Sequence, residues 1–286
     1  MEKLTIKKIK KSHNIITHNG KFHADDVYST ALLKYINPNL KVIRVPSSQG
    51  YEVNGNIIVD IGGGRYDHHG NVKELRSNNI PYASFGKLWR DIGRDIVDED
   101  NFNKFDKIIV QPIDYTDNCG GTNPLSVMVS SFNALWDEDE TSDECFNNAV
   151  YFALFTLKRY FKRVFTKRTA KDTILNLYNQ SENHEYLVTD EFIPAINFLA
   201  DTLAKFYIYP SDRGGYCIQG VPCSQNTNKI KVNFPASWLG RSGKSLYKVS
   251  GIKGLKFCHS ANYIAVCNTK EVAINTVKSL LVKNGI

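Results

Sequence analysis

The sequence predicts an α/β protein in which a parallel-sheet domain comes first and a smaller α+β domain follows at the C-terminal end. Short β-type runs alternate with helical patterns in the first half, which is the order that a parallel sheet with helical crossovers requires. In the last third, β-type runs are separated by Pro and Gly turns, which is typical of antiparallel strands. A length of 286 residues is enough to build two such cores.

The elements of the first domain follow from residue type and spacing. Apolar β-branched runs indicate strands, and apolar residues at helical spacing indicate helices. Pro38 ends the first helix, and the run of glycines at 62–64 stops the third strand. The expected elements are, in order, a strand at 14–17, a helix at 24–36, strands at 41–45 and 56–60, and helices at 83–96 and 102–113.

A long helical region at 142–178 leads to a polar break at 179–183, where we place the domain boundary. The first domain then covers 1–180, and the second covers 181–286. The elements expected after the break are strands at 206–209, 216–221 and 229–232, a helix at 238–249, strands at 255–257 and 263–266, and a closing helix at 270–282.

Composition and hydropathy exclude several classes of protein. A hydrophobic fraction of 42% and a charged fraction of 23% are ordinary for a globular protein and exclude a disordered chain or a collagen-like fibre. The longest apolar run, Ala149–Phe155, is far shorter than the roughly 20 residues that span a bilayer, so we expect no membrane association. Residues 1–11 are basic but precede no apolar segment of the secretory kind. We therefore expect a soluble cytoplasmic protein, and an organellar location is compatible with the same features.

The cysteine pattern agrees with a reducing compartment. Six cysteines are scattered along the chain, and no two of them form a Cys-x-x-Cys pair. In a chain of this size, the pattern indicates reduced thiols that fill the core, and it argues against a disulfide framework or a zinc site. We expect no cysteine nucleophile. A homo-oligomer is compatible with the sequence, but no sequence pattern indicates an oligomeric state.

Charge is distributed unevenly between the two halves. Residues 1–150 contain 17 Lys and Arg against 21 Asp and Glu, a net charge of −4, whereas residues 151–286 contain 19 against 8, a net charge of +11. We expect the first part to hold cations and the second to hold anions. The stretch 158–171 has seven positive charges, no acid, and interleaved Phe and Tyr, which fits a phosphate backbone. A solvated helix face explains the same stretch equally well.

Side chains of the kind that bind metals follow the expected strands, at the edge of the sheet where open α/β proteins place their sites. His18, His23 and Asp25 lie at the turn from the first strand into the first helix. Asp60 ends the third strand, and the glycine-rich turn behind it folds the chain tightly enough for His68 to face the same point. The sequence therefore predicts a cation site at this edge.

A further acidic pair, Asp114 and Asp117, follows the last expected helix of the domain. Mixed imidazole and carboxylate ligands suit Mn²⁺, Fe²⁺ or Zn²⁺ better than Ca²⁺. The candidates outnumber the ligands of one tetrahedral site, so we expect two divalent cations. Neighbours on an extended chain point in opposite directions, so we expect one of His68 and His69 to bind metal and the other to reach the substrate or the core.

Three motifs contain most of these residues: T-H-x4-H-A-D at 17–25, V-D-I-G-G at 59–63 and Y-D-H-H at 66–69. They resemble the motifs of the melanocyte-proliferating-gene-one (Myg) family, which belongs to the DHH phosphoesterase superfamily. The resemblance extends over nearly the whole chain. Shorter matches are A-S-x-G-x-L-W at 83–89, I-D-x2-D-N at 113–118, N-x2-W at 133–136, V-x-D-x-F-x-P at 188–194, Y-I-Y-P at 207–210, F-P-x2-W at 234–238 and K-V-S-G-I at 248–252.

The resemblance implies a two-domain phosphoesterase with divalent cations, Mn²⁺ in first place and Mg²⁺ as the alternative. For this family it implies a 3′-to-5′ exonuclease that acts on RNA. It also implies that His69 contacts the scissile phosphate and that Asp67 orients His68 from behind. Of the later acids, Asp117 is preferred over Asp114, because its Asp-Asn step resembles the Asp-Thr step of relatives. The implied metal ligands are His18, His23, Asp25, Asp60, His68 and one of Asp114 and Asp117.

The second domain departs from the family pattern at one place. Ala265 and Val266 stand where family members tend to have a glycine pair, which would let the backbone approach a phosphate closely. The side chains that remain available to bind substrate are His259, Ser260 and Lys270 of this domain and Lys162 and Arg163 of the basic stretch.

The expected reaction is metal-assisted hydrolysis of a phosphodiester, with RNA as the preferred partner and single-stranded DNA as an alternative substrate. Two other functions remain open: a phosphohydrolase for short oligonucleotides or nucleoside phosphates, and a non-catalytic RNA-binding protein. The net charge of +11 on the second part favours a long substrate, because a dinucleotide needs only about two or three cationic contacts.

Overall fold

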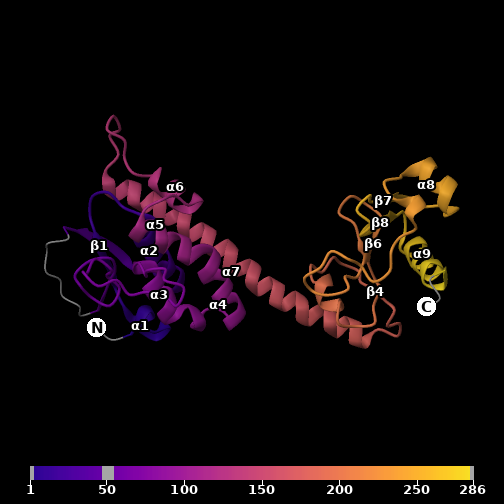
Figure 1. The fold of residues 1–286 in the computed structure, drawn as a ribbon, viewed down its shortest axis with the longest axis horizontal. Helices are drawn as coiled ribbons and strands as arrows, with labels where there is room; N and C mark the ends of the chain where they lie inside the picture. Colours follow the sequence, from indigo (N-terminus) through magenta and orange to yellow (C-terminus); the bar gives the residue numbers. More distant parts are fainter. Residues whose placement is uncertain (1–2, 47–54, 284–286) are drawn as a thin grey trace. The chain divides into compact units, whose positions relative to one another are not determined.

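The computed structural model describes residues 3–46 and 55–283, and the chain divides into two compact units, 1–162 and 163–286 (Figure 1). The division lies inside the long helix α7 (Ser142–Gln180). It therefore comes earlier than the boundary expected near residue 180, which is the end of the same helix.

Helix α7 belongs to both units because its first half and its C-terminal part are buried in different cores. Phe161 contacts Trp89 and Phe105 of the first unit, with ring centroids 6.1 and 5.4 Å apart. Ile174 and Tyr178 are buried among side chains of the second unit. The helical pattern continues without a break from Phe161 to Ile174. The polar segment at 179–183 therefore marks the end of the helix and not the division between the two cores.

The first unit combines three short strands with helices. The predicted helix at 24–36 and strands at 14–17 and 41–45 are confirmed, the first strand being one residue longer. The elements are, in chain order, α1 (Ile6–Lys11), β1 (Asn14–His18), α2 (Ala24–Ile36), β2 (Lys41–Val45), β3 (Asn56–Ile58), α3 (Ser84–Ile92), the 3-10 turn η1 (Gly93–Asp95), α4 (Glu99–Phe105), the π-helical turn η2 (Asp106–Val110), α5 (Gln111–Cys119), α6 (Pro124–Ser130) and the start of α7.

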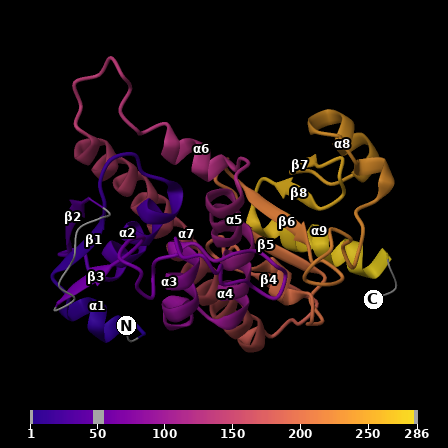
Figure 2. The same ribbon diagram turned by 60° about the vertical axis from the view of Figure 1, so that its left-hand side comes forward.

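Strands β1, β2 and β3 form a parallel sheet in the order β2-β1-β3 (Figure 2). Ile15 of the central strand is opposite Val42 on one side and Ile57 on the other. Because the strands are parallel, their carboxyl ends share one edge of the sheet. The predicted parallel sheet is confirmed. At this edge β1 leads into α2, and β3 leads into the glycine-rich turn.

Helix α2 is the central helix of this unit. It contacts α3, α5 and α6, and every residue from Ala24 to Leu33 is buried. Trp89 of α3 anchors the aromatic part of the core, where Phe102 stacks on its ring at 5.3 Å between centroids. The packing on all sides of α2 keeps the acidic residues of its first turn away from water.

Two predicted helices of the first unit are interrupted. The helix expected at 83–96 ends at Ile92, and η1 follows, where a side chain on Gly93 would collide with the Trp89 ring. The helix expected at 102–113 is divided by η2 and restarts with Pro112 in the first turn of α5. Proline has no N–H to leave unpaired there. Helices α1 and α6 were not predicted.

The second unit contains a five-stranded sheet and the helices that cover it. Its strands at 206–209, 216–221, 255–257 and 263–266 were predicted to within one residue at each end. The elements are β4 (Tyr186–Val188), the 3-10 turn η3 (Ile196–Leu199), β5 (Phe206–Pro210), β6 (Tyr216–Gly220), the 3-10 turn η4 (Ala236–Trp238), α8 (Gly243–Ser250), β7 (Leu255–Cys258), β8 (Ile264–Cys267) and α9 (Lys270–Lys283).

The second sheet has the order β4-β5-β6-β8-β7. Its neighbours are antiparallel as predicted, except that β4, which was not predicted, pairs with β5 in parallel. Alternate residues of β5 enter different cores: Phe206 and Ile208 pack on the side of α9, whereas Tyr207 and Tyr209 pack with the end of α7. The sheet is thus covered by helices on both faces, and the α+β class is confirmed.

Two expectations for the second unit are wrong. The strand expected at 229–232 is reduced to a single bridge between Ile230 and Pro222, because proline cannot donate to a ladder. The helix expected at 238–249 is replaced by η4 and, further on, α8. Gly240 between them has a φ of +71°, a left-handed conformation that interrupts a helix.

No helix in the described residues is long and apolar enough to cross a membrane. All six cysteines are free thiols, and four of them are buried. Burial raises the pKa of Cys258 and of Cys267 to about 11, so neither thiol is ionised at neutral pH.

Candidate metal centre

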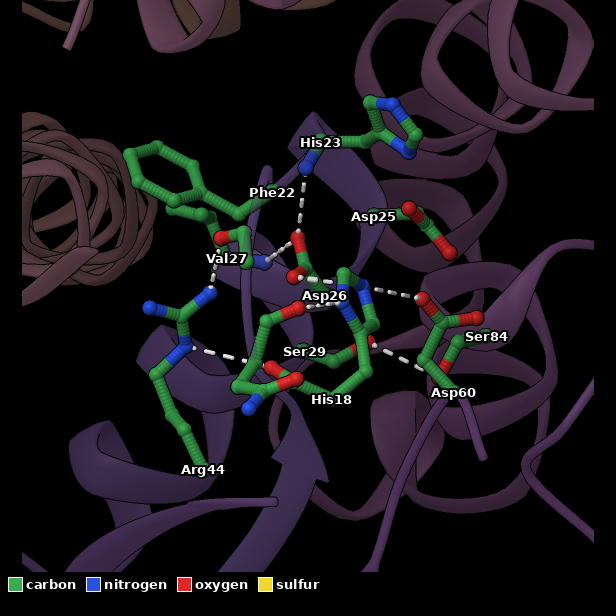
Figure 3. Close-up of polar contacts among 12 residues, drawn as sticks. His18, Phe22, His23, Asp25, Asp26, Val27, Ser29, Arg44, Asp60 and Ser84 are labelled. Carbon is green, nitrogen blue, oxygen red and sulfur yellow. Dashed lines mark hydrogen bonds and ion pairs between the residues drawn. The ribbon is translucent and has the colours of Figure 1, made fainter. Parts of the chain in front are cut away.

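His18 and Asp60 meet at the carboxyl edge of the parallel sheet. His18 is the last residue of β1, and Asp60 follows β3 by two residues. Nε2 of His18 lies 3.4 Å from Oδ2 of Asp60 (Figure 3). Asp60 has a φ of +61°, and its N–H donates to the carbonyl oxygen of Tyr66 at 2.9 Å. A left-handed aspartate is uncommon and is held here by the turn that follows β3.

The first turn of α2 adds further ligand-type side chains at the same place. Asp26 Oδ1 accepts hydrogen bonds from the N–H groups of His23, at 3.0 Å, and Val27, at 2.7 Å. Its Oδ2 lies 3.1 Å from Nε2 of His18. Asp26 is a site residue that was not predicted. The sequence did contain a sign of it, because an acid three residues after a helix cap is placed to accept from the cap N–H.

His68 reaches the cluster from the loop after the glycine-rich turn. Its Nε2 lies 3.1 Å from Asp60 Oδ1, 3.1 Å from Asp117 Oδ2 and 3.5 Å from Asp25 Oδ2. The structure thus brings His68 and Asp60 together, as the tight turn predicted. Asp117 comes from α5, so four separate segments of the chain meet at this point.

Asn118 orients the His68 ring from the opposite side. Its Nδ2 donates to the backbone oxygen of Asp114 at 3.0 Å, which leaves its Oδ1 to face Nδ1 of His68 at 3.1 Å. An amide oxygen only accepts, so Nδ1 carries the hydrogen, and in the neutral ring the lone pair of Nε2 points into the carboxylates. Hydrogen bonds of this kind are what hold metal-binding histidines in place.

Asp67 contacts His69, which corrects its expected role toward His68. Its Oδ1 accepts from the His69 N–H at 3.1 Å and lies 2.8 Å from Nδ1 of the same residue. Its Oδ2 accepts from the N–H of Gly63 at 2.7 Å. Both oxygens of the Asp67 carboxylate are therefore occupied by contacts within the same turn. Asn118, and not Asp67, is the residue that orients His68.

His68 and His69 do not point in opposite directions, because they lie in an irregular segment and not on a strand. Their ring centroids are 4.4 Å apart, and Nδ1 of His69 lies 3.7 Å from Asp60 Oδ1. The two side chains differ in exposure, since that of His68 is 4% exposed and that of His69 is 61% exposed. His69 is therefore the one that solvent or a substrate can reach.

Ligand atoms gather in three groups, each able to hold a metal ion. Within each group, one nitrogen or oxygen atom per residue lies within 4.8 Å of the others. Asp60 belongs to two of them, which makes these two groups neighbours. The groups are Asp60 with His68 and His69, His18 with Asp26 and Asp60, and His23 with Asp25 and Asp117.

Among the described residues, the buried carboxylates of the cluster form ion pairs with histidines and with no Lys or Arg. Asp25 and Asp26 are 0% exposed and Asp60 is 2% exposed. Both Asp25 oxygens are buried without a hydrogen bond to any described residue. Such atoms cost free energy unless something binds them. The nitrogen and oxygen donors fit divalent cations such as Mn²⁺.

The cluster strongly shifts the pKa values of its members. Burial raises the pKa of Asp25 well above its ordinary value, and the charges of Asp60 and Asp117 raise it further. Burial also acts to raise the pKa of Asp60, but hydrogen bonds from His18 and His68 outweigh it and lower the pKa to about 2. For both histidines, burial acts to lower the pKa, and the carboxylates outweigh it and raise the pKa to about 10. At neutral pH the two rings hold protons that a cation would have to displace.

Asp114 lies outside the cluster, although it is only one helical turn from Asp117. Its Oδ2 is 2.6 Å from Arg76, and its Oδ1 accepts from the N–H of Gly86 at 3.0 Å. A Cβ atom at Gly86 would collide with this carboxylate, so α3 can approach only through a glycine. Burial raises the pKa of Asp114 to about 7 against the opposing effect of Arg76. The structure thus places Asp117 with the other ligands and Asp114 at the α3–α5 contact.

Lys162 and Arg163 are adjacent and exposed on α7. In the part of the chain that the structure describes, neither forms an ion pair. Further along the same helix, Nζ of Lys167 and of Lys171 lie 5.8 and 5.2 Å from the ring centroid of Phe198. The basic stretch is therefore open to an anion at its centre and packed on an aromatic ring at its end.

The other predicted substrate-binding residues lie at two ends of the second sheet. His259 and Ser260 follow β7, whose end pairs with the start of β8. Lys270 begins α9 after the end of β8, and it forms a 2.7 Å ion pair with Asp190. Because β8 lies between these positions, the structure does not bring Lys270 together with the other two residues.

The fold and the site define an α/β protein with a candidate divalent-metal centre of His and Asp side chains. The sequence model of the MYG1_exonuc family, described as an uncharacterised protein family (UPF0160), matches residues 14–281. The chain belongs to this family, as the motifs predicted.

Curated relatives match almost the whole chain at modest identity. A MYG1 protein of Dictyostelium discoideum is 25% identical over 312 residues, covering 91% of this chain and 94% of the relative. A MYG1 protein of Chlamydia pneumoniae is 26% identical over 299 residues, covering 96% and 98%. A protein of Rattus norvegicus named MYG1 exonuclease is 23% identical over 325 residues, covering 93% and 84%. No solved structure matches the chain.

Proposed function

We propose that the protein is a divalent-metal-dependent phosphodiesterase that removes nucleotides from the 3′ end of RNA. One observation carries the proposal: Asp25, Asp60 and Asp117 are gathered around His68 without a Lys or Arg partner among the described residues. For a purely structural cluster, so much buried negative charge would be costly, and cations would offset the cost. Relatives from Rattus norvegicus and Mus musculus bear the name MYG1 exonuclease, which supports a nuclease.

The residues of the centre would divide into those that hold cations and one that contacts substrate. Bound cations would supply a water of lowered pKa and positive charge for the phosphoryl oxygens. His69 is exposed, and its contact with Asp67 through Nδ1 would hold the ring so that Nε2 can face a phosphoryl oxygen. The residues that would hold the cations are His18, His23, Asp25, Asp60, His68 and Asp117, with Asp26 as an additional carboxylate at His18.

Nucleic acid is the substrate class that the charge of the chain favours. The half from residue 151 onward carries a net charge of +11, and Lys162 and Arg163 are exposed on α7. A polyanion gains affinity from many such contacts, because each one releases counterions. The preference for RNA and the direction of degradation follow from the family resemblance.

The test uses 5′-labelled RNA of several lengths, incubated with the protein and Mn²⁺. A 3′-to-5′ exonuclease produces a ladder of labelled products that shorten with time, and Asp25→Asn should abolish the ladder. The same assay with DNA of the same sequence measures whether the protein prefers ribose or deoxyribose in its substrate.

Each alternative has its own result in this assay. If only the shortest oligomers are cleaved, the protein is a phosphohydrolase of small substrates, and the exonuclease proposal fails. If RNA binds but no nucleotide is released with Mn²⁺, Mg²⁺ or Zn²⁺, the protein binds RNA without hydrolysing it.

A further inference from the structure

A pocket of about 470 Å³ lies beside the candidate metal centre, within the first unit. His23 and Asp117 line it, and both also belong to one of the three ligand groups. The rest of the lining comes mainly from α5, residues 121–122 and α6. The roles proposed above for the metal centre use none of these other side chains.

The lining is rich in hydroxyl groups, and none of its described residues is Lys or Arg. Thr116, Thr122 and Ser126 contribute hydroxyls, and Val127 contributes an apolar surface. A phosphate in this pocket would meet no cation from the protein and would face the Asp117 carboxylate. A neutral polar group fits better, because it can hydrogen-bond to the hydroxyls and pack its flat face on Val127.

Asn123 determines what two of the hydroxyls can offer to a ligand. The two hydrogens of its Nδ2 face three oxygen atoms: the Pro112 carbonyl oxygen at 3.0 Å, Thr116 Oγ1 at 2.8 Å and Ser126 Oγ at 2.6 Å. Its Oδ1 accepts from the Ser126 N–H at 3.0 Å. An amide nitrogen accepts no hydrogen bond, so neither hydroxyl donates to Asn123 Nδ2, and each keeps its own hydrogen for another acceptor. Donors held in this way suit the oxygen and nitrogen acceptors of a sugar or a base.

We infer that this pocket binds the terminal nucleoside of the substrate, the one whose 5′ phosphate lies at the metal centre. The inference rests on the proposed function for the identity of that substrate. Pockets for small molecules measure about 300–1,000 Å³. A volume of about 470 Å³ is therefore suited to one nucleoside and not to a run of several.

Val127→Trp tests the inference because it places a large ring in the pocket. Val127 is 51% exposed on α6, so the larger side chain does not disturb a core. Met128→Trp is the matched control, since Met128 is 49% exposed on the same helix and does not line the pocket. With Mn²⁺ present, two substrates are compared: RNA, and bis(4-nitrophenyl) phosphate, a phosphodiester without a nucleoside.

In Val127→Trp, we expect kcat/KM for RNA to fall by about tenfold or more, mainly through KM. Hydrolysis of bis(4-nitrophenyl) phosphate should stay within about twofold of the wild type. Met128→Trp should leave both substrates unaffected. An equal loss on both substrates, or no loss on RNA in a folded Val127→Trp variant, would overturn the inference.

Binding of uridine 5′-monophosphate separates this inference from the proposed function. If the wild type hydrolyses neither substrate, the proposed function fails. The pocket is then supported if the wild type and Met128→Trp bind the nucleotide about tenfold more tightly than Val127→Trp. Equal affinity in all three proteins rejects the pocket. Should Val127→Trp not fold, Ser130→Leu, at an exposed position of the same lining, replaces it with the same expected results.

Discussion

Asn118 and His68 are joined by a 3.1 Å contact between Oδ1 and Nδ1, while the preceding residue, Asp117, lies 3.1 Å from Nε2 of the same ring. Two successive residues of α5 thus hold both edges of one imidazole. Because α5 supplies a contact on each side of the ring, its position helps to set how His68 is oriented in the ligand cluster.

Replacing Asn118 with Ala should weaken Mn²⁺ binding by about 10- to 100-fold, because His68 loses the group that orients it. Isothermal titration of the metal-free protein measures the change. Asn103→Ala is the control, since Asn103 is exposed and its side chain hydrogen-bonds to Glu99, away from the ligand cluster. An unchanged Mn²⁺ affinity in Asn118→Ala would show that the ring needs no such support.

Asp25→Asn and His68→Ala should each lower RNA hydrolysis by about three orders of magnitude or more, while RNA binding stays largely intact. Mn²⁺ should raise the Tm of the wild type, because it binds the folded chain, and raise that of either variant much less. Asp139→Asn, at an exposed acid outside the cluster, is the control and should behave as the wild type. Retained turnover in both variants would defeat the assignment of the site.

The different positions of Asp117 and Asp114 lead to opposite expectations. Asp117→Asn should weaken Mn²⁺ binding with little loss of stability. Arg76→Met should lower the free energy of unfolding by about 3 kcal/mol, because it leaves the buried Asp114 without its partner. It should leave Mn²⁺ affinity unchanged. Urea denaturation and metal titration of both variants measure these effects, and the reverse pattern would make Asp114 the ligand.

Mn²⁺ affinity should rise with pH between about 6 and 9. The carboxylates raise the pKa of His18 and of His68 to about 10, so both rings are protonated throughout this range and the metal must displace the protons. In the metal-free protein, the stability that these protons contribute is fully present below pH 6.5 and is lost as the pH rises toward 10. Titration in two buffers of different ionisation enthalpy measures the protons released. Binding that releases none and does not vary with pH would contradict this expectation.

Charge reversal at Lys162 and Arg163 should weaken binding to long single-stranded RNA and reduce the slope of log K against log salt by roughly 0.7 for each lost contact. Fluorescence anisotropy over a salt series measures the slope. Reversal of Lys104 and Lys107, which are also exposed and lie on the first unit, changes the net charge by the same amount and serves as the control. If both double variants behave alike, the α7 stretch is a solvated helix face.

Local patterns predicted the longer elements well. Helix α2 and strand β2 begin and end where residue type and spacing place them, because their apolar patterns and Pro38 act within a few residues. The three-residue strand β4 was missed and a strand at 229–232 was expected in error. Short strands depend on the partner that they pair with, and that partner is distant in the sequence.

The sequence by itself determined which kinds of candidate ligand side chain follow the strands and at which edge of the sheet they lie. His18 and Asp60 each follow a strand, and parallel strands necessarily end at a common edge. Only the tertiary structure decided that Asp117 joins them, that Asn118 orients His68, and that Asp26 takes part. These choices depend on which way a helix face turns and on contacts between residues about fifty positions apart, and the spacing of residues along a chain does not specify either.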